Sequence, residues 1–276
     1  MRNKIRAVFT AAEIDSEHGR ELKSHPGASY GGFVMKNNSD FEDYIGVVKA
    51  LIQYAGDNGF DAVSLTQTPL IYHTEYNQGI DFALENCGFT VSCSEMTQSV
   101  DLTRLSDNPL EDLVDKTRNA CRKALNKGLL YVENAGLTPE NLADFHSILF
   151  ENRKTLGVKP THTLDELVEL SRLIPENLHL AFIEYHSKRI AGLLHFVCNP
   201  QVVLLFYVCH ERAEQNLKPV PLIMANTLKW AKSRGFRELD FGISTVKGDP
   251  NFGLIKFKEN FRTRPFLRNT YFLKLN

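Results

Sequence analysis

The feature that most constrains the 276-residue sequence is a pattern that occurs twice. In the first half, Gly59-Phe60 ends an amphipathic segment, and Phe82 lies in the next amphipathic segment. In the second half, Gly235-Phe236 and Phe257 hold the corresponding places, 176 and 175 residues further along. A nearly constant offset of this kind indicates two copies of one supersecondary unit. The sequence therefore predicts that one α/β unit occurs in tandem.

Hydrophobic periodicity and helix-capping residues predict the elements of the second copy. We expect helices at about 138–157 and 163–173, strands over Leu178–Tyr185, Arg189–Cys198 and Val202–Val208, a helix over Pro221–Arg234, a strand over Glu238–Phe241, a short helix over Asn251–Phe261 and a last strand over Asn269–Leu275. The fold class that follows is α/β with a mixed (α+β) sheet, in which helices alternate with strands.

The first copy shows a shorter version of the same order. We expect strands over Ile5–Ala12 and Tyr30–Lys36, a helix from about Ser39 to Asn58, a strand over Asp61–Gln67, a helix over Glu75–Cys87 and a strand over Phe89–Leu102. A two-faced helix over Pro109–Lys127 joins the copies. Because the first copy lacks the two opening helices, we expect it to be shortened, with halves at 1–108 and 129–276 around the connecting helix at 109–128.

Composition excludes several classes of protein. With 43% hydrophobic residues the chain can form a core, and its net charge of −1 gives no overall field that attracts nucleic acid or an anionic membrane. Its longest apolar runs are too short to span a bilayer. The first ten residues show no signal-peptide pattern, so we expect a cytoplasmic protein without a membrane span.

The five cysteines indicate neither a disulfide framework nor a zinc site. They are odd in number and dispersed, and no two have the C-x-x-C spacing of a structural zinc site. We expect them to be reduced core thiols, and we expect no metal.

Three short motifs carry a resemblance to a known family. They are His25–Gly32, which has a Pro-Gly turn before Gly-Gly; the basic segment Arg118–Ala124; and Leu239–Ser244 followed by Gly253–Phe261, which contains Phe-Lys-x-x-Phe. In this order they resemble the GNAT acyltransferase superfamily. The tandem arrangement is similar to Fem-type aminoacyltransferases, which build peptidoglycan cross-bridges, and to related acetyltransferase-like proteins.

The resemblance implies transfer of an acyl group to an amine, without a bound cofactor. The acceptor would be a small molecule or a cell-wall precursor, and tRNA is a candidate partner. GNAT enzymes commonly hold coenzyme A at a glycine-rich turn, where this chain has Glu214–Pro221, which contains two prolines and no glycine. The donor therefore stays open between acyl-CoA and aminoacyl-tRNA, and a non-catalytic ligand-binding protein is the alternative from another class.

Three residues are candidates for the chemistry. Lys258 falls between Leu254 and Phe261 on an apolar helical stripe, where a lysine needs an anionic partner or a task unless it reaches solvent. By resemblance, it would stabilise charge on the reacting carbonyl. Asp240 lies in an apolar strand. If its carboxylate points inward, it is a candidate partner of Lys258 or a candidate base. Tyr207 alternates with Leu205 on a strand, and is either catalytic or a core tyrosine.

The candidates for substrate binding come from the same motifs. A basic helical face, with Arg118, Arg122 and Lys123, could hold a phosphate of a nucleotide-linked substrate or of tRNA, although such a face is often only solvated. The motifs add Tyr30, Phe257 and Ser244 to the predicted set.

Overall fold

The computed structural model describes residues 5–155 and 157–275. It divides into two compact units. Unit 1 consists of Met1–Thr97, Ile243–Asn251 and Phe266–Asn276, and unit 2 consists of Gln98–Gly242 and Phe252–Pro265. The mixed α/β class is confirmed. Two segments from the C-terminal part of the chain group with the N-terminal residues, so the units are not continuous ranges.

Unit 1 is built on a mixed sheet with the strand order β2-β3-β5-β14-β6. These strands are β2 (Ala11–Ser16), β3 (Gly19–Ser24), β5 (Ala62–Thr66), β14 (Arg264–Lys274) and β6 (Thr90–Asp101). The last strand of the chain, β14, is antiparallel to β5, with Thr270 opposite Thr66 and Lys274 opposite Ala62. A small separate sheet pairs β1 (Ala7–Phe9) with β4 (Phe33–Met35).

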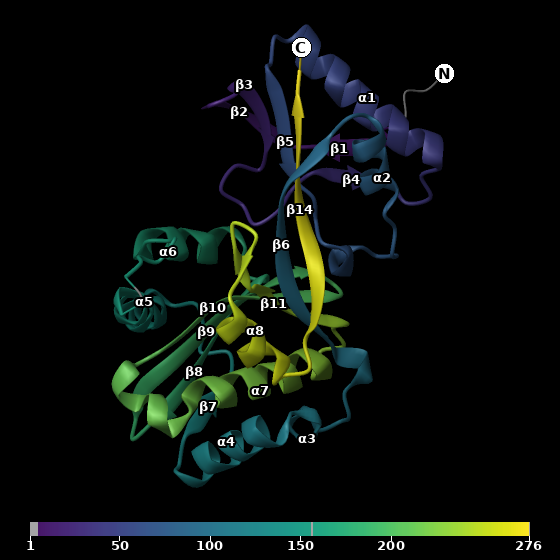
Figure 1. Ribbon diagram of the computed structural model, residues 1–276. Coiled ribbons are helices and arrows are strands. Elements are labelled where there is room, and N and C mark those ends of the chain that lie inside the picture. The colour runs from purple at the N-terminus through teal and green to yellow at the C-terminus, as the bar shows by residue number, and fades with distance from the viewer. Residues whose placement is uncertain (1–4, 156, 276) are drawn as a thin grey trace. The chain divides into compact units, whose positions relative to one another are not determined.

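Two helices, α1 (Phe41–Asp57) and α2 (Gly79–Asn86), complete the core of unit 1 (Figure 1). Asp40 and Asp43 form a capping box that starts α1. The apolar face of α1 then packs into a core with β5 and β14, which includes Val48, Leu65 and Tyr271. The remaining elements are the 3-10 turn η1 (Leu70–Tyr72) and a hairpin of β12 (Thr245–Val246) and β13 (Asp249–Pro250).

Unit 2 has the strand order β6-β11-β10-β9-β8-β7. The strands are β7 (Leu130–Val132), β8 (Leu178–Tyr185), β9 (Lys188–Asn199), β10 (Val202–His210) and β11 (Glu238–Ile243). The strands from β7 to β10 are antiparallel neighbours, whereas β10 and β11 are parallel from Val202 opposite Glu238 to Leu204 opposite Asp240.

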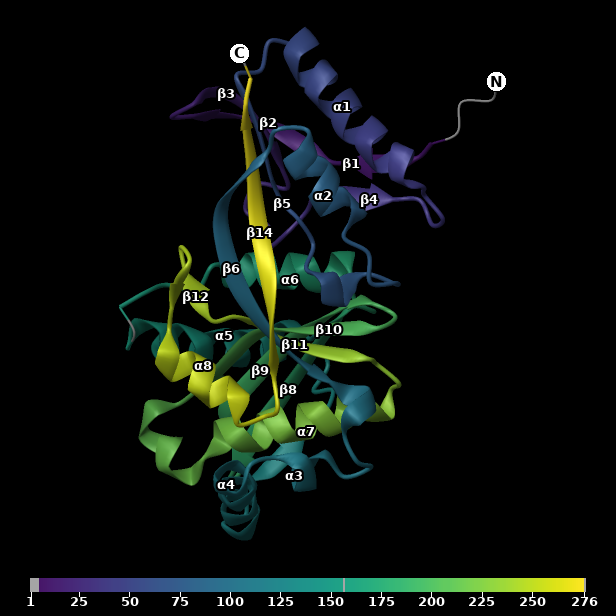
Figure 2. The same cartoon turned by 45° about the vertical axis from the view of Figure 1, so that its right-hand side comes forward.

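Helices cover both faces of the strands of unit 2 (Figure 2). One core lies against α7 (Pro219–Ser233) and α4 (Asp115–Asn126), and a second lies against α5 (Pro139–Lys154) and α6 (Leu164–Leu173). The short elements are η2 (Leu102–Arg104), α3 (Pro109–Asp112), η3 (Arg212–Leu217) and α8 (Phe252–Glu259). No helix in the described ranges is long and apolar enough to cross a membrane.

The structure corrects several predicted elements. The expected helix over Pro109–Lys127 is broken, because Leu113 adopts an extended conformation and turns its side chain into the core. The strand expected over Tyr30–Lys36 is only β4, and the helix expected from Glu75 begins at Gly79. The hairpin of β2 and β3 was not predicted, since its sequence is rich in charged residues. The strands β8, β9 and β10 agree with the prediction within two residues, and the tandem repeat itself stays a prediction.

Candidate functional site

Strand β11 of unit 2 buries two carboxylates. Alternation along the strand places Leu239 and Phe241 in the core beside α7, and Glu238 and Asp240 on the other face. Glu238 accepts hydrogen bonds from Ser99 at 2.7 Å and Arg264 at 3.0 Å. Asp240 is only 2% exposed, so its carboxylate points inward, the condition under which the sequence made it a candidate partner of Lys258 or a base.

Lys258 and Asp240 both form hydrogen bonds with the backbone of one residue, Gly242. The Asp240 carboxylate accepts the Gly242 N–H at 2.8 Å, and the Lys258 ammonium donates to the Gly242 carbonyl at 2.8 Å. Gly242 has a φ of 74°, a left-handed conformation that glycine adopts without steric cost. The turn of the backbone at Gly242 therefore lets the end of β11 bind both charged groups.

Lys258 is buried, as its place on the helix predicted. Its side chain is 5% exposed, whereas the Lys256 side chain is 77% exposed and pairs with Glu259. Burial lowers the pKa of Lys258 to about 8, and the negative charge of Asp240 opposes this shift. The group therefore remains mainly an ammonium at neutral pH while lying in a poorly hydrated environment.

Tyr207 lies in a different environment from the one its spacing suggested. A β-bulge between Leu205 and Tyr207 shifts the register of β10, so these two residues do not share a face. Leu205 joins the core beside α7, whereas Tyr207 joins the core beside α5. The Tyr207 hydroxyl accepts from the His162 backbone N–H at 3.3 Å and lies 2.9 Å from His162 Nδ1.

Both arginines on the basic face of α4 are paired with acids. Arg118 donates to the Glu111 carbonyl at 2.8 Å and forms an ion pair with Asp115. Arg122 pairs with Glu111 at 2.9 Å, and Lys123 is exposed. These ion pairs neutralise much of the charge that the prediction assigned to a phosphate.

The other predicted binding residues are distributed over both units. Phe257, in unit 2, is half-buried and packs on Phe261 with ring centroids 5.3 Å apart. Ser244, in unit 1, is buried, and its backbone N–H donates to the Met96 carbonyl at 2.8 Å. Tyr30, also in unit 1, packs against Tyr72 with ring centroids 4.7 Å apart and the rings tilted by 51°.

The start of α7 occupies the place of the expected coenzyme A turn. Lys218 adopts a left-handed conformation with a φ of 62°, and Pro219 begins the helix. Because Pro219 and Pro221 have no backbone N–H, Val220 is the one donor among the first three helical residues. This helix start therefore offers few amides to an anion.

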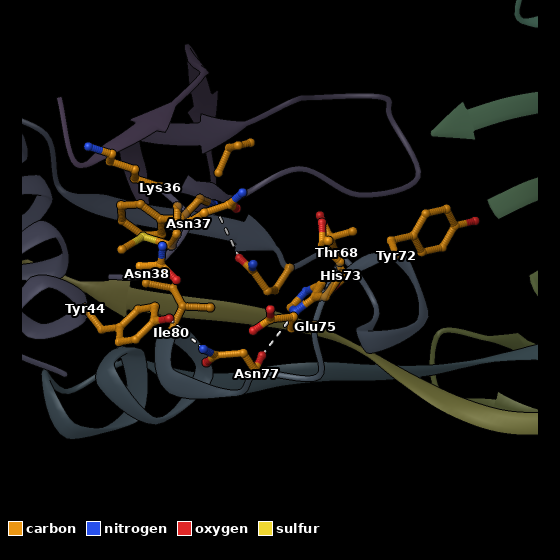
Figure 3. A pocket seen from close by; sticks show the side chains of 15 residues that line it. Lys36, Asn37, Asn38, Tyr44, Thr68, Tyr72, His73, Glu75, Asn77 and Ile80 are labelled. Carbon is orange, nitrogen blue, oxygen red and sulfur yellow. Dashed lines mark hydrogen bonds between the residues drawn. The ribbon is translucent and has the colours of Figure 1, made fainter. Parts of the chain in front are cut away.

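Sequence reasoning missed a hollow of about 520 Å³ in unit 1, shown in Figure 3. It lies among residues that follow β4, β5 and η1, which are separated by long stretches of sequence. The density of asparagine around it, at Asn37, Asn38 and Asn77, was the available signal. Over the described ranges, the structure has no group of three or more histidine, cysteine or acidic side chains that could hold a metal.

Residues 115–252 match the model of the acetyltransferase (GNAT) domain family, and the chain belongs to that family. The match contains β10, β11 and Asp240 and ends before Lys258.

Solved structures share the fold over most of the chain. FemX is 14% identical with a TM-score of 0.71, over 97% of this chain and 89% of that chain. L-PGS from Bacillus licheniformis is 14% identical with a TM-score of 0.67, over 98% and 82%. A tandem GNAT protein from the clavulanic acid biosynthesis pathway is 11% identical with a TM-score of 0.53, over 92% and 75%. These identities show a shared fold alone, and no curated protein matches the sequence.

Proposed function

We propose that the protein transfers an acyl group from an activated ester or thioester to an amine, and that Lys258 stabilises the transition state. The observation that carries the proposal is the buried ammonium of Lys258, held at the end of β11 by the Gly242 carbonyl and the charge of Asp240. Membership of the GNAT family supports acyl transfer in general.

The proposed step needs a positive group near the carbonyl oxygen. The amine nitrogen attacks the acyl carbon, a C–N bond forms, and the bond to the leaving group breaks, while the proton lost by the amine ends on the leaving alkoxide or thiolate. Negative charge collects on the carbonyl oxygen during the attack. A donor with low hydration stabilises this charge more than one in water, and it needs little reorganisation during the reaction. Lys258 has both properties, and Asp240 is its positioning residue.

The test compares two lysines of the same helix. The full-length chain is incubated with acetyl-CoA or alanyl-tRNA and a panel of primary amines, and N-acylated products are measured by mass spectrometry. We expect Lys258→Met to lower turnover by about a hundredfold, and Lys256→Met to change it little. Equal turnover of the two variants, or no N-acylated product from any pair, would contradict the proposal.

A Fem-type reaction with an aminoacyl-tRNA donor is the second candidate. It is favoured by the prolines at the start of α7, because an aminoacyl ester of tRNA does not need the amide cradle that coenzyme A uses. The ion pairs of Arg118 and Arg122 count against it, since they occupy the cations that would contact tRNA phosphates. Product from alanyl-tRNA but not from acetyl-CoA would select this candidate.

A non-catalytic ligand-binding role is the third candidate. The few amides at the start of α7 favour it, and the buried charge of Lys258 counts against it. A buried lysine costs stability, which a protein without a use for the charge could avoid by carrying an apolar residue there. Recovery of the acyl donor and the amine acceptor unreacted in every assay would select this candidate.

A further inference from the structure

The hollow in unit 1 has the size of a small-molecule site. Its volume of about 520 Å³ lies within the range of about 300–1,000 Å³ that is common for ligand pockets. Its walls are the end of β4 with Lys36–Asn38, the end of β5 with Gln67 and Thr68, and the segment from Tyr72 to Asn77 before α2 (Figure 3).

Side chains hold the wall before α2 in place. His73 lies 3.1 Å from the Asn77 carbonyl through Nδ1, and 3.2 Å from the Thr68 carbonyl through Nε2. Asn77 donates to the Tyr44 hydroxyl at 2.7 Å and accepts the Gly79 N–H at 2.7 Å. This segment is therefore tied to both α1 and β5.

Two glycines make room for side chains that line the hollow. A Cβ at Gly79 would lie 2.6 Å from the Tyr44 ring, and a Cβ at Gly32 would lie 2.2 Å from Gln67 Oε1. Any larger residue at these positions would displace Tyr44 or Gln67. The backbone is therefore shaped around these two lining groups.

The lining combines amide and hydroxyl groups with one lysine, Lys36, and one carboxylate. Asn37, Asn38 and Gln67 carry amides, which both donate and accept hydrogen bonds, as sugar hydroxyls do. The Tyr44 hydroxyl accepts from Asn77, so its own hydrogen can be donated to a ligand. Of the described residues that line the hollow, Glu75 is the one with a carboxylate, which suits an ammonium group.

We propose that this hollow binds an amino sugar, with its hydroxyls on the amides and the Tyr44 hydroxyl and its ammonium on Glu75. The proposal goes beyond the proposed function, because binding of the sugar in unit 1 does not require acyl transfer. A nucleotide is a poorer fit, since the described lining residues include no arginine and the charge of Glu75 offsets that of Lys36, which leaves no net positive charge for a diphosphate.

The test measures binding to the full-length chain by calorimetry, with glucosamine, glucose and UDP as probes. We expect glucosamine to bind at least fivefold more tightly than glucose. Glu75→Gln should reduce that preference to less than twofold, and Tyr44→Phe should weaken both sugars by about fivefold to tenfold, the effect of one hydrogen bond. The matched controls are Glu85→Gln on α2 and Tyr54→Phe on α1, both exposed and outside the hollow, which should leave binding unchanged.

Three results would overturn the proposal: UDP binding more tightly than glucosamine, a preference for glucosamine that survives Glu75→Gln, or a Kd for glucosamine weaker than about 10 mM. Failure of the proposed function is separate, because Lys258→Met should lower turnover by about a hundredfold and leave glucosamine binding intact. Glucosamine that binds through Glu75 supports the site whether or not it is acylated.

Discussion

Single residues in this protein are held by hydrogen bonds that leave few alternatives. Gly242 binds Asp240 through its N–H and Lys258 through its carbonyl, so one left-handed residue positions two opposite charges. The motif around His25 works in a similar way. Ser24 donates its one hydrogen to the Thr10 carbonyl at 2.8 Å and accepts the Gly32 N–H at 2.9 Å. Because the Ser24 hydroxyl has only one hydrogen, any other group that hydrogen-bonds to its oxygen must be the donor.

The stability of the protein should depend on the titration of Lys258. Its pKa is lowered from 10.5 to about 8 in the folded state, so the folded protein binds fewer protons than the unfolded chain between these values. The free energy of unfolding should therefore rise with pH across about 8 to 10.5, by up to about 3 kcal/mol relative to Lys258→Met. Urea unfolding of both proteins at several pH values measures this difference. A difference that stays constant with pH would contradict the assignment.

His25 should carry its proton on Nδ1. It lies 3.0 Å from Ser24 Oγ, and that oxygen has no hydrogen left to donate, so Nδ1 must be the donor. In nitrogen-detected NMR at high pH, we expect His25 in the Nδ1–H tautomer, and we expect Ser24→Ala to shift it toward Nε2–H. His186 is the control and should not respond, because it is exposed; its φ of 48° is similar to the φ of 47° at His25. An Nε2–H tautomer of His25 in the wild-type protein would refute the prediction.

At the scale of elements, the ends of helices and strands decide what each unit can bind. The start of α7 is poor in amides because of two prolines, whereas the turn before β4 depends on Gly32 for its shape. In these two places, one or two residues determine how many backbone amides a helix offers or which shape a turn adopts.

Acetyl-CoA should bind weakly. A helix start holds a pyrophosphate through several adjacent N–H groups, and α7 offers one among its first three residues. We expect a Kd above about 100 μM, or a binding free energy of about −5.5 kcal/mol at most. Calorimetry on the wild-type protein measures it directly, and a low-micromolar Kd would show that another element supplies the missing donors.

Two glycines with similar backbone conformations should respond differently to alanine. Gly32 has a φ of 87° and Gly27 a φ of 81°, so each substitution should cost about 1–2 kcal/mol for the left-handed conformation. A Cβ at Gly32 would also meet Gln67 at 2.2 Å, whereas a Cβ at Gly27 meets open space among the described residues. We expect Gly32→Ala to lower the free energy of unfolding by at least 1 kcal/mol more than Gly27→Ala. Equal losses in thermal unfolding would contradict this account.

At the scale of the whole molecule, the two units are each assembled from distant parts of the chain. Unit 1 takes the last strand, β14, as the neighbour of β5, and unit 2 contains the end of β6. Residues near the C-terminus should therefore support the N-terminal unit.

Truncation of Tyr271 tests this arrangement. Tyr271 is buried in the core of unit 1 and donates to Asp81 at 3.0 Å. We expect Tyr271→Ala to cost about 3–5 kcal/mol and to increase hydrogen exchange in β5. Leu267→Ala on the same strand, where the side chain is 64% exposed, should cost less than about 0.5 kcal/mol. If hydrogen exchange instead increases only in β8 and β9, the assignment of β14 to unit 1 is wrong.

Sequence alone determined the order of the main helices and strands in unit 2 and the place of Lys258 on the inward face of its helix, because periodicity and capping are local properties of the chain. The partner of the last strand, the face occupied by Tyr207 and the hollow in unit 1 were decided only by the tertiary structure. Strand partners depend on contacts between distant segments, and a single bulge residue reverses the alternation that places Tyr207. The hollow needs three segments brought together by folding, so no local pattern in the sequence could specify it.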